Sequence, residues 1–336
     1  MYRKIMGFLE AWKESEHRKP LILQGARQVG KTYSILEFGR THYENVAYFN
    51  FETNPKLNET FEENISPDYL IPILSHIAGQ TIVKEKTLIV FDEVQLCERA
   101  LTSLKYFCEN APDYHIIVAG SLLGVAVNRA KFSFPVGKVD MKTLYPMDME
   151  EFMLALGEDD LVEQIKKCFQ TDTPLPSALH DAAMQLYRQY LVVGGMPECV
   201  MQFAETKDYI LVRHTQDTIL ASYLNDMSKY NNLNEIKKTR LAYDNITVQL
   251  SKKNTRFQYK LIKKGGRASE FENAIEWLCL SGIVSQVYKV EQIKKPLENY
   301  RDIDAFKIYV SDLGLLCAKK DLAANDILYM VEEIND

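Results

Sequence analysis

The stretch from Gly25 to Thr32 reads GARQVGKT, and its residue types and spacing could hold the phosphates of a nucleotide. It fits the pattern G-x-x-x-x-G-K-[ST], in which glycines let a tight loop turn its backbone N–H groups toward phosphate oxygens. Lys31 would reach the β- and γ-phosphates, and the hydroxyl of Thr32 would bind Mg²⁺. The pattern is short, so an ordinary Gly-Lys turn is the alternative.

The residues on either side of this loop favour the phosphate interpretation. The run KPLILQG is typical of a buried strand, and KTYSILEFGR is helical up to about Gly39. A helix that begins at the loop directs its positive end at a phosphate. We do not decide whether Arg27 contacts nucleotide or faces solvent. The predicted ATP-contacting residues are Gly25, Ala26, Arg27, Gln28, Val29, Gly30, Lys31, Thr32 and Tyr33.

A pair of carboxylates, Asp92 and Glu93, follows the apolar run TLIVF. In a P-loop protein, an aspartate at the end of such a strand holds Mg²⁺, and the next glutamate can polarise the attacking water. We therefore assign Asp92, with Thr32, to Mg²⁺ and Glu93 to general-base or water-positioning work. Strands often end in acids, so this assignment depends on the presence of the loop.

Ser121 ends a further apolar run, IIVAGS, and is the last predicted catalytic residue beside Lys31, Asp92 and Glu93. It could sense the γ-phosphate, cap the next helix, or do both. The transition state also calls for a cation, an arginine finger. Arg129 and Lys138 are candidates in the same chain, and a second chain could supply it instead.

The composition is that of an ordinary globular protein, with 46% hydrophobic and 26% charged residues in 336. No apolar run approaches the length of about 18 residues that a membrane helix needs. The N-terminus resembles an amphipathic helix more than a signal peptide, so we expect a cytoplasmic protein that does not contact membranes. The six cysteines are scattered without a CxxC pair, which argues against zinc or a disulfide framework.

Apolar strands alternate with helices through the first part of the chain, which predicts a parallel sheet covered on both faces. One more strand and a helix starting near Asp148 follow, and TDTPLPS is a plausible boundary. Beyond it the pattern is helical, until the helix SEFENAIEWLCLSGIV precedes the strands VSQVYKV and FKIYVSD. Helices followed by a β-hairpin indicate a winged helix. The expected domains are an ATPase domain at 1–170, a helical linker at 171–230 and a winged-helix-like domain at 231–336.

Six motifs in this order resemble bacterial and archaeal AAA+-like ATP-binding proteins that carry a C-terminal domain of unknown function. The motifs are PLILQGARQVGKT, LIVFDEVQ, IIVAGSLLG, LYPMDMEEF, YLVVGGMPECV and IYVSDLGLL. The resemblance covers nearly the whole chain. It implies an α/β, parallel-sheet P-loop NTPase core, then a mainly helical, winged-helix-like region, and often a nuclease-like domain at the far end.

Two departures from the family pattern limit what the resemblance implies. Members usually have Gly-Arg where this chain has Gly137-Lys138, and lysine lacks the planar fork of arginine. Relatives typically continue beyond MVEEIND into the nuclease-like domain, whose acidic and lysine cluster is not found here. We therefore do not expect nuclease activity, and we leave open whether the chain is a truncated form. The Gly-Gly pair in YLVVGGMPECV is either a hinge or a structural turn.

The net charge of −6 hides a basic region between Lys229 and Lys320, with 18 Lys and Arg against 10 Asp and Glu. Within it, the segment Lys252–Arg267 carries seven cations with Phe257 and Tyr259 interleaved, and it could bind nucleic acid. A solvated basic face is the alternative. The helix SEFENAIEW carries three glutamates, which suits a protein partner better than DNA.

The sequence therefore predicts Mg²⁺-dependent ATP binding and hydrolysis, slow without a partner and coupled to a conformational change of the C-terminal domain. The alternative is a switch that hydrolyses ATP slowly or not at all and docks DNA or a protein when nucleotide is bound. A nucleoside or shikimate-type kinase is a weaker third candidate, because it needs no Asp-Glu pair on an apolar strand. Partner, biological process and oligomeric state stay open.

Overall fold

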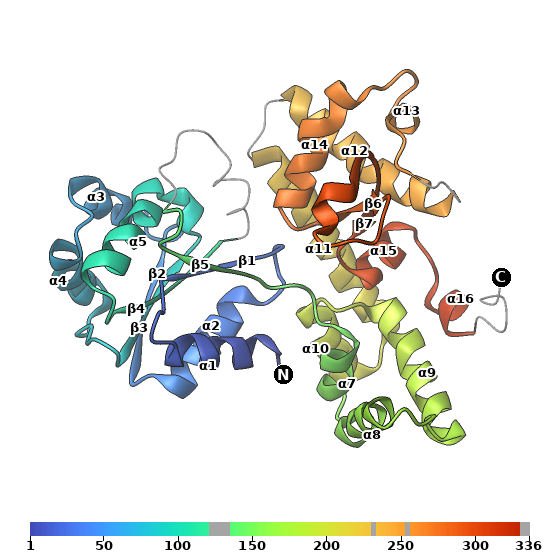
Figure 1. Ribbon diagram of the computed structural model, residues 1–336, viewed down its shortest axis with the longest axis horizontal. Helices are drawn as coiled ribbons and strands as arrows, with labels where there is room; N and C mark the ends of the chain where they lie inside the picture. The colour runs from blue at the N-terminus through green and yellow to red at the C-terminus, as the bar shows by residue number, and fades with distance from the viewer. Residues whose placement is uncertain (121–134, 230–232, 253–255, 330–336) are drawn as a thin grey trace. The chain divides into compact units, whose positions relative to one another are not determined.

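The computed structural model of the chain describes residues 1–120, 135–229, 233–252 and 256–329. Its contacts divide the chain into two compact units, residues 3–145 and residues 146–336, the latter together with 1–2. Each unit is described by itself (Figure 1). The three-domain division into 1–170, 171–230 and 231–336 stays a prediction.

The described part of the first unit contains one parallel sheet of five strands in the order β2-β3-β4-β1-β5. The strands are β1 (Leu21–Gln24), β2 (Asn45–Asn50), β3 (Thr87–Asp92), β4 (His115–Ala119) and β5 (Asp140–Thr143). In register, Ile22 lies opposite Val118 and Asn50 lies opposite Asp92. The predicted parallel α/β core is confirmed. Because the strands are parallel, the residues that follow β1 and β3 emerge at the same edge of the sheet.

Helices cover both faces of this sheet (Figure 1). One face carries α1 (Ile5–Glu14) and α2 (Lys31–His42), where Gly39 of α2 sits closely against Val46 and Leu88. The other face carries α3 (Lys56–Glu63), α4 (Pro67–Ala78) and α5 (Glu98–Asn110), and the short 3₁₀ turn η1 (Val94–Leu96) follows β3. Continuous apolar strands such as β3, which is buried at every residue, follow from this double covering.

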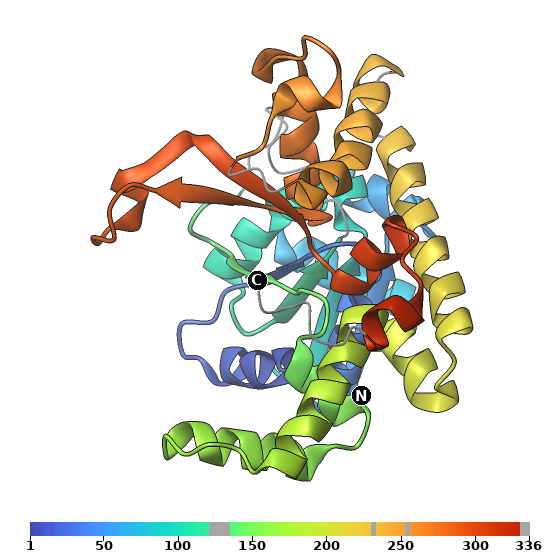
Figure 2. The same cartoon turned by 90° about the vertical axis from the view of Figure 1, so that its right-hand side faces the viewer.

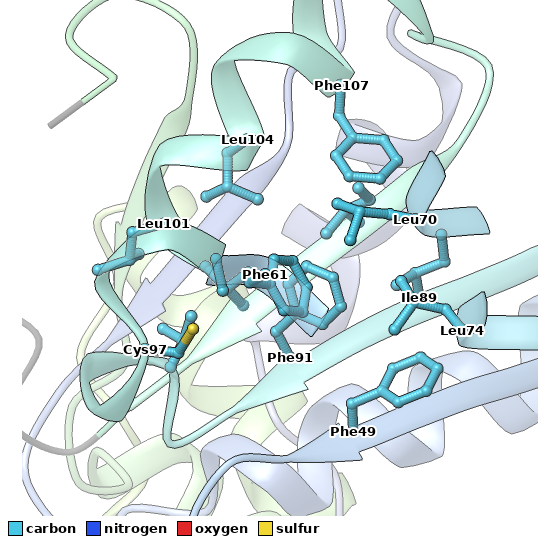
Figure 3. Close-up of a cluster of buried hydrophobic side chains, with 14 of the residues drawn as sticks. Phe49, Phe61, Leu70, Leu74, Ile89, Phe91, Cys97, Leu101, Leu104 and Phe107 are labelled. Atoms are coloured by element: carbon cyan, nitrogen blue, oxygen red, sulfur yellow. The ribbon is translucent and has the colours of Figure 1, made fainter. Parts of the chain in front are cut away.

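A cluster of aromatic and aliphatic side chains fills the face beneath α3, α4 and α5 (Figure 3). Phe91 of β3 lies at its centre, with ring centroids 5.5 Å from Phe61 and 6.0 Å from Phe49 in edge-on arrangements. Such pairs stabilise by about 0.5–1.5 kcal/mol each beyond the area they bury. Because Phe91 precedes Asp92, this packing holds the carboxyl end of β3 in place.

The second unit is mostly helical in its described part, as the sequence predicts. Its helices are α7 (Met149–Ala155), α8 (Asp159–Gln170), α9 (Ser177–Val193), α10 (Pro197–Thr206), α11 (Tyr209–Lys229), α12 (Leu233–Ser251), α13 (Tyr259–Ile262), α14 (Ala268–Leu280), α15 (Leu313–Lys319) and α16 (Ala324–Leu328). The predicted start near Asp148 is confirmed: its carboxylate accepts from Glu151 N at 3.0 Å, and the Glu151 carboxylate accepts from Asp148 N at 3.1 Å. No helix in the described ranges combines the length and the apolar composition needed to cross a bilayer.

Strands β6 (Val284–Val290) and β7 (Arg301–Val310) form an antiparallel hairpin, with the 3₁₀ turn η2 (Leu297–Tyr300) between them. Figure 2 shows this hairpin, in orange-red, extending beyond the helices of its own unit. Val287 lies opposite Lys307, and Ser285 lies opposite Tyr309. The predicted order of helices followed by two short strands is confirmed.

A buried junction in the second unit joins three motifs that lie far apart in the sequence. Gly195 N donates to the Asp312 carboxylate at 2.6 Å, and Met147 N donates to Gly195 O at 2.6 Å. A Cβ on Gly195 would overlap the Met147 carbonyl, and Gly194 has a φ of +76°. Asp312 also caps α15 by accepting from Leu315 N at 2.8 Å. These contacts are compatible with a structural turn at the Gly-Gly pair, and its role as a hinge stays a prediction.

Candidate functional site

The loop between β1 and α2 follows the path that its glycines permit. Gly25 has a φ of +148° and Gly30 a φ of +90°, a region that glycine adopts without a steric cost. A Cβ on Gly25 would overlap the carbonyl oxygen of Leu144. Gln28 also has a positive φ, of +66°, at a position where the pattern does not require glycine. The glycine spacing is therefore a requirement of the loop's backbone.

Lys31 lies inside the loop at the start of α2. Its Nζ donates to the carbonyl oxygens of Gly25 and Ala26, both at 2.8 Å. Burial lowers the pKa of the Lys31 ammonium to about 8, against the opposing effect of Glu93 and Asp92 nearby. The backbone thus curves around a desolvated cation at a helix N-terminus, which is an arrangement suited to an anion.

The loop is also held from outside by Arg3, a residue that belongs to none of the motifs found in the sequence. The Arg3 guanidinium is buried and donates to Val29 O at 2.9 Å and to Tyr145 O at 2.8 Å. These partners lie 26 and 142 residues away along the chain. No local pattern connects three such segments, so only the folded chain brings them together.

Asp92 lies at the end of β3 and contacts Thr32 of α2. Thr32 Oγ1 donates to Asp92 Oδ2 at 2.9 Å, across 60 residues of sequence. Tyr48 OH donates to the same oxygen at 2.7 Å, and Glu93 N donates to Asp92 Oδ1 at 3.0 Å. The carboxylate is 5% exposed, so these three donors fix its orientation.

Tyr48 is the second residue that sequence reasoning missed. Burial and its bond to Asp92 keep the phenol protonated, with its pKa raised to about 12. Tyr48 lies two residues before the end of β2, the strand that pairs with β3. The sequence did contain a signal for this residue. Tyr48 is polar and lies near the carboxyl end of β2, which pairs with the strand that ends at Asp92.

Glu93 follows Asp92 in a left-handed conformation, with a φ of +51°. The side-chain amide of Gln95 donates to Glu93 Oε2, and burial raises the pKa of the Glu93 carboxyl. The other polar atom of that amide, Gln95 Oε1, is buried and has no hydrogen-bond partner within the described ranges. The Glu93 carboxylate, whose basicity is raised, therefore lies beside Gln95 Oε1, a hydrogen-bond acceptor without a partner in the described structure.

Comparison with known families agrees with this geometry. Residues 17–153 match the family model described as an AAA domain, and residues 184–326 match one described as a domain of unknown function (DUF8612). Residues 17–153 form an AAA domain. The resemblance predicted from the six motifs is thus confirmed for both parts of the chain. No curated protein sequence matches this chain.

Solved structures similar to this chain include proteins from an archaeon and a bacterium. The Aeropyrum pernix ORC2 protein is 13% identical, with 95% of this chain and 94% of that chain covered and a TM-score of 0.45. The Thermotoga maritima RuvB Holliday junction branch migration motor is 13% identical, with 91% and 90% covered and a TM-score of 0.36. The Aeropyrum pernix ORC1 protein in complex with DNA is 12% identical, with 95% and 91% covered and a TM-score of 0.33.

The remaining candidate residues of the AAA domain are placed as follows. Tyr33 is 57% exposed in the first turn of α2, and Arg27 is half-buried in the loop. Ser121, the predicted γ-phosphate sensor, and Arg129, a candidate arginine finger, lie outside the described residues. The roles of these four residues stay predictions.

Lys138 is not near the phosphate loop. It precedes β5, whose first residue, Asp140, pairs with Leu21 at the start of β1. Gly25 follows the other end of β1, so Lys138 lies toward the opposite edge of the sheet. Its Nζ forms an ion pair with Glu109 Oε1 at 2.9 Å. This placement argues against Lys138 as the cation for transition-state charge.

Proposed function

We propose that the AAA domain binds ATP with Mg²⁺ and hydrolyses the γ-phosphate bond. The observation that carries this proposal is the hydrogen bond of 2.9 Å between Thr32 and Asp92, beside the buried ammonium of Lys31. A hydroxyl, a carboxylate and a cation, which come from two motifs 60 residues apart, lie at one edge of the sheet. An ordinary Gly-Lys turn has no need of this constellation.

The residues present suit the predicted ligands. The loop N–H groups and Lys31 would hold the β- and γ-phosphates, after Lys31 exchanges its carbonyl partners for phosphate oxygens. Hard oxygen donors of the kind that Mg²⁺ prefers come from Thr32 and, through water, from Asp92. When bound there, the ion would neutralise charge on the phosphate oxygens. Tyr48 would hold the Asp92 carboxylate in its orientation.

Glu93 is the proposed general base toward the attacking water. Its raised pKa makes it a stronger proton acceptor than an exposed glutamate. Gln95 Oε1, buried and without a partner in the described structure, could accept a hydrogen bond from the same water. Ser121 keeps its proposed role as a sensor of the γ-phosphate.

Two substitutions test the proposal by separating binding from hydrolysis. Lys31→Ala should weaken binding of a fluorescent ATP analogue at least about tenfold, because it removes a charge-assisted contact to phosphate. Glu93→Gln should keep binding but lower turnover about 10²–10⁴-fold, the range for losing a general base. Phosphate release measured with and without Mg²⁺ gives the turnover.

Lys138→Ala is the matched control, because it removes a lysine that pairs with Glu109 and leaves the loop untouched. Its turnover should equal that of the wild type. Turnover that survives in Glu93→Gln, or that needs no Mg²⁺, would contradict the proposal.

A specific contact favours a second candidate, the slow or non-hydrolysing nucleotide switch. The Gln95 amide donates a hydrogen bond to Glu93 Oε2, and the Lys31 ammonium donates to carbonyl oxygens of the loop. Glu93 must therefore lose its Gln95 partner before it accepts a proton, and Lys31 must lose its carbonyl partners before it binds phosphate. Turnover would then be slow until a partner shifts these contacts. Nucleotide-dependent partner binding that persists without measurable hydrolysis would favour the switch.

The proposed interaction domain is the last part of the chain, predicted as 231–336. Helices α12, α13 and α14 precede the β6–β7 hairpin, and Phe257 N donates to Phe306 O of β7 at 2.7 Å, adding a short extended segment beside the hairpin. This order supports a winged-helix-like domain. We propose that the ATP cycle changes its conformation and that it docks a macromolecule.

A further inference from the structure

Three cations from two segments of the second unit line one pocket. Lys252 follows the end of α12, Arg256 lies a few residues later, and Lys307 comes from β7. Gln249 and Tyr309 are two further polar residues of the lining, and none of the lining residues is acidic. Within the described ranges, none of the three cations forms an ion pair.

The two residues that follow Arg256 are held by contacts with β7 and α12. Phe257 is buried, its N–H donates to Phe306 O at 2.7 Å, and its ring stacks on Phe306 with centroids 5.7 Å apart. Gln249 is buried and binds Gln258 on both sides: it accepts from Gln258 N at 2.7 Å and donates to Gln258 O at 3.2 Å. The backbone next to Arg256 is thereby held against both α12 and β7.

Lys307 and Tyr309 share the outer side of the hairpin. Both are exposed, whereas the alternating residues Phe306 and Ile308 are buried. This alternation turns the Lys307 side chain toward solvent, while its buried neighbours Phe306 and Ile308 anchor the strand on the core side.

The other cations of the basic segment are arranged differently. Lys263 pairs with Glu270 at 3.2 Å, and the outer side of α14 exposes Glu272 and Glu276. An acidic helix surface repels a phosphate backbone, so α14 does not suit the role of a recognition helix. The basic segment is thus split between a pocket free of acids and a surface of mixed charge.

We propose that the pocket of Lys252, Arg256 and Lys307 binds the phosphodiester backbone of a nucleic acid. This deepens the proposed function, on which it rests, by naming the partner of the interaction domain and the residues that contact it. The Arg256 fork can hold two phosphate oxygens at once, and the two lysines add point charges. The segment after α12 and strand β7 carry the contact, and α14 does not.

The test is binding of a labelled duplex DNA of about 30 base pairs to the full chain over a salt series, followed by fluorescence anisotropy. The variant K252Q/R256Q/K307Q should bind at least about tenfold more weakly at roughly 0.1 M salt. The slope of log K against log salt should become about 3 less steep, because each lost phosphate contact removes about 0.9. Its ATP turnover without DNA should equal that of the wild type.

The matched control is K260Q/K264Q/R267Q, which removes the same charge from exposed residues of the basic segment that do not line the pocket. Its affinity should change little. Equal losses in the two variants, or no DNA binding by the wild type at low salt, would overturn the proposal while leaving ATP turnover unaffected. A pocket-dependent preference for polyglutamate over DNA would assign it to an acidic protein and overturn it too.

Discussion

At the scale of single residues, the charge of Lys31 determines how tightly phosphates are held. The pKa of its ammonium is lowered to about 8 by burial, and only the protonated form can donate to phosphate. Affinity for ATP should therefore be constant below pH 8 and fall about tenfold for each pH unit above it. Titration with a fluorescent ATP analogue between about pH 7 and pH 10 measures this.

Lys31→Arg is the control, because a guanidinium stays charged over this range. Its affinity, though weaker, should not vary with pH. A wild-type profile that stays flat up to pH 10 would show that the ammonium keeps its ordinary pKa of about 10.4.

A second residue-scale prediction concerns Tyr48, which donates to Asp92 Oδ2 at 2.7 Å. Tyr48→Phe should raise the Mg²⁺ concentration needed for half-maximal turnover about tenfold. The reason is that Asp92 would lose a hydrogen-bond partner that orients its carboxylate toward the metal. Maximal turnover at saturating Mg²⁺ should change little. Turnover measured against Mg²⁺ concentration gives both values.

Tyr43→Phe is the matched control, since the Tyr43 hydroxyl bonds His115 Nδ1 at 2.7 Å in the same unit. Both variants lose one hydroxyl and one partly buried hydrogen bond, so both lose some stability. Only the Tyr48 variant should change the Mg²⁺ requirement. An identical shift in the two variants would mean that Tyr48 has a structural role alone.

At the scale of elements, the second unit depends on the junction where the ends of α9 and β7 meet the residues before α7. Gly195→Ala should destabilise this unit by about 3 kcal/mol, because the added Cβ would displace the Met147 carbonyl from a buried contact. Urea denaturation followed by the fluorescence of Trp277, which lies in this unit, measures the loss.

Gly7→Ala serves as the control, because a Cβ at Gly7 in α1 would have nothing within 4 Å. It should leave the first unit equally stable or up to about 1 kcal/mol more stable, since alanine favours a helix. If Gly195→Ala unfolded at the same midpoint urea concentration as the wild type, the junction would tolerate a side chain.

At the scale of the whole molecule, the two tryptophans report on the two units separately. Trp12 is buried in the first unit and Trp277 in the second. In Glu93→Gln, ATP with Mg²⁺ should raise the unfolding temperature seen by Trp12, because a ligand stabilises the state that binds it. If the ATP cycle is coupled to the C-terminal domain, as proposed, the transition seen by Trp277 should shift too.

Trp277→Phe leaves the fluorescence of Trp12 alone, and Trp12→Phe leaves that of Trp277 alone. Lys31→Ala is the control, which should abolish the shift in unfolding temperature in both cases. A shift confined to Trp12 would show that the units respond independently, and it would remove coupling from the proposed function.

The sequence by itself determined the features that depend on neighbours along the chain. The strand before Gly25, the helix after it and the apolar run ending at Asp92 follow from side-chain period and from the backbone freedom of glycine. The helix start at Asp148 follows from its capping pair with Glu151. Each is set by interactions over a few residues, so a single segment contains the information.

Tertiary structure alone decided which segments meet. Arg3 reaches Val29, Tyr48 reaches Asp92, and Arg256 lines the same pocket as Lys307 only because the packing of distant elements brings them together. Lys138 was a candidate because the transition state calls for a cation, and the direction of β5 places it toward the other edge of the sheet. Strand order depends on how whole faces pack, and no local pattern encodes it. The residues of the phosphate loop could therefore be named from sequence, whereas those that hold it required the fold.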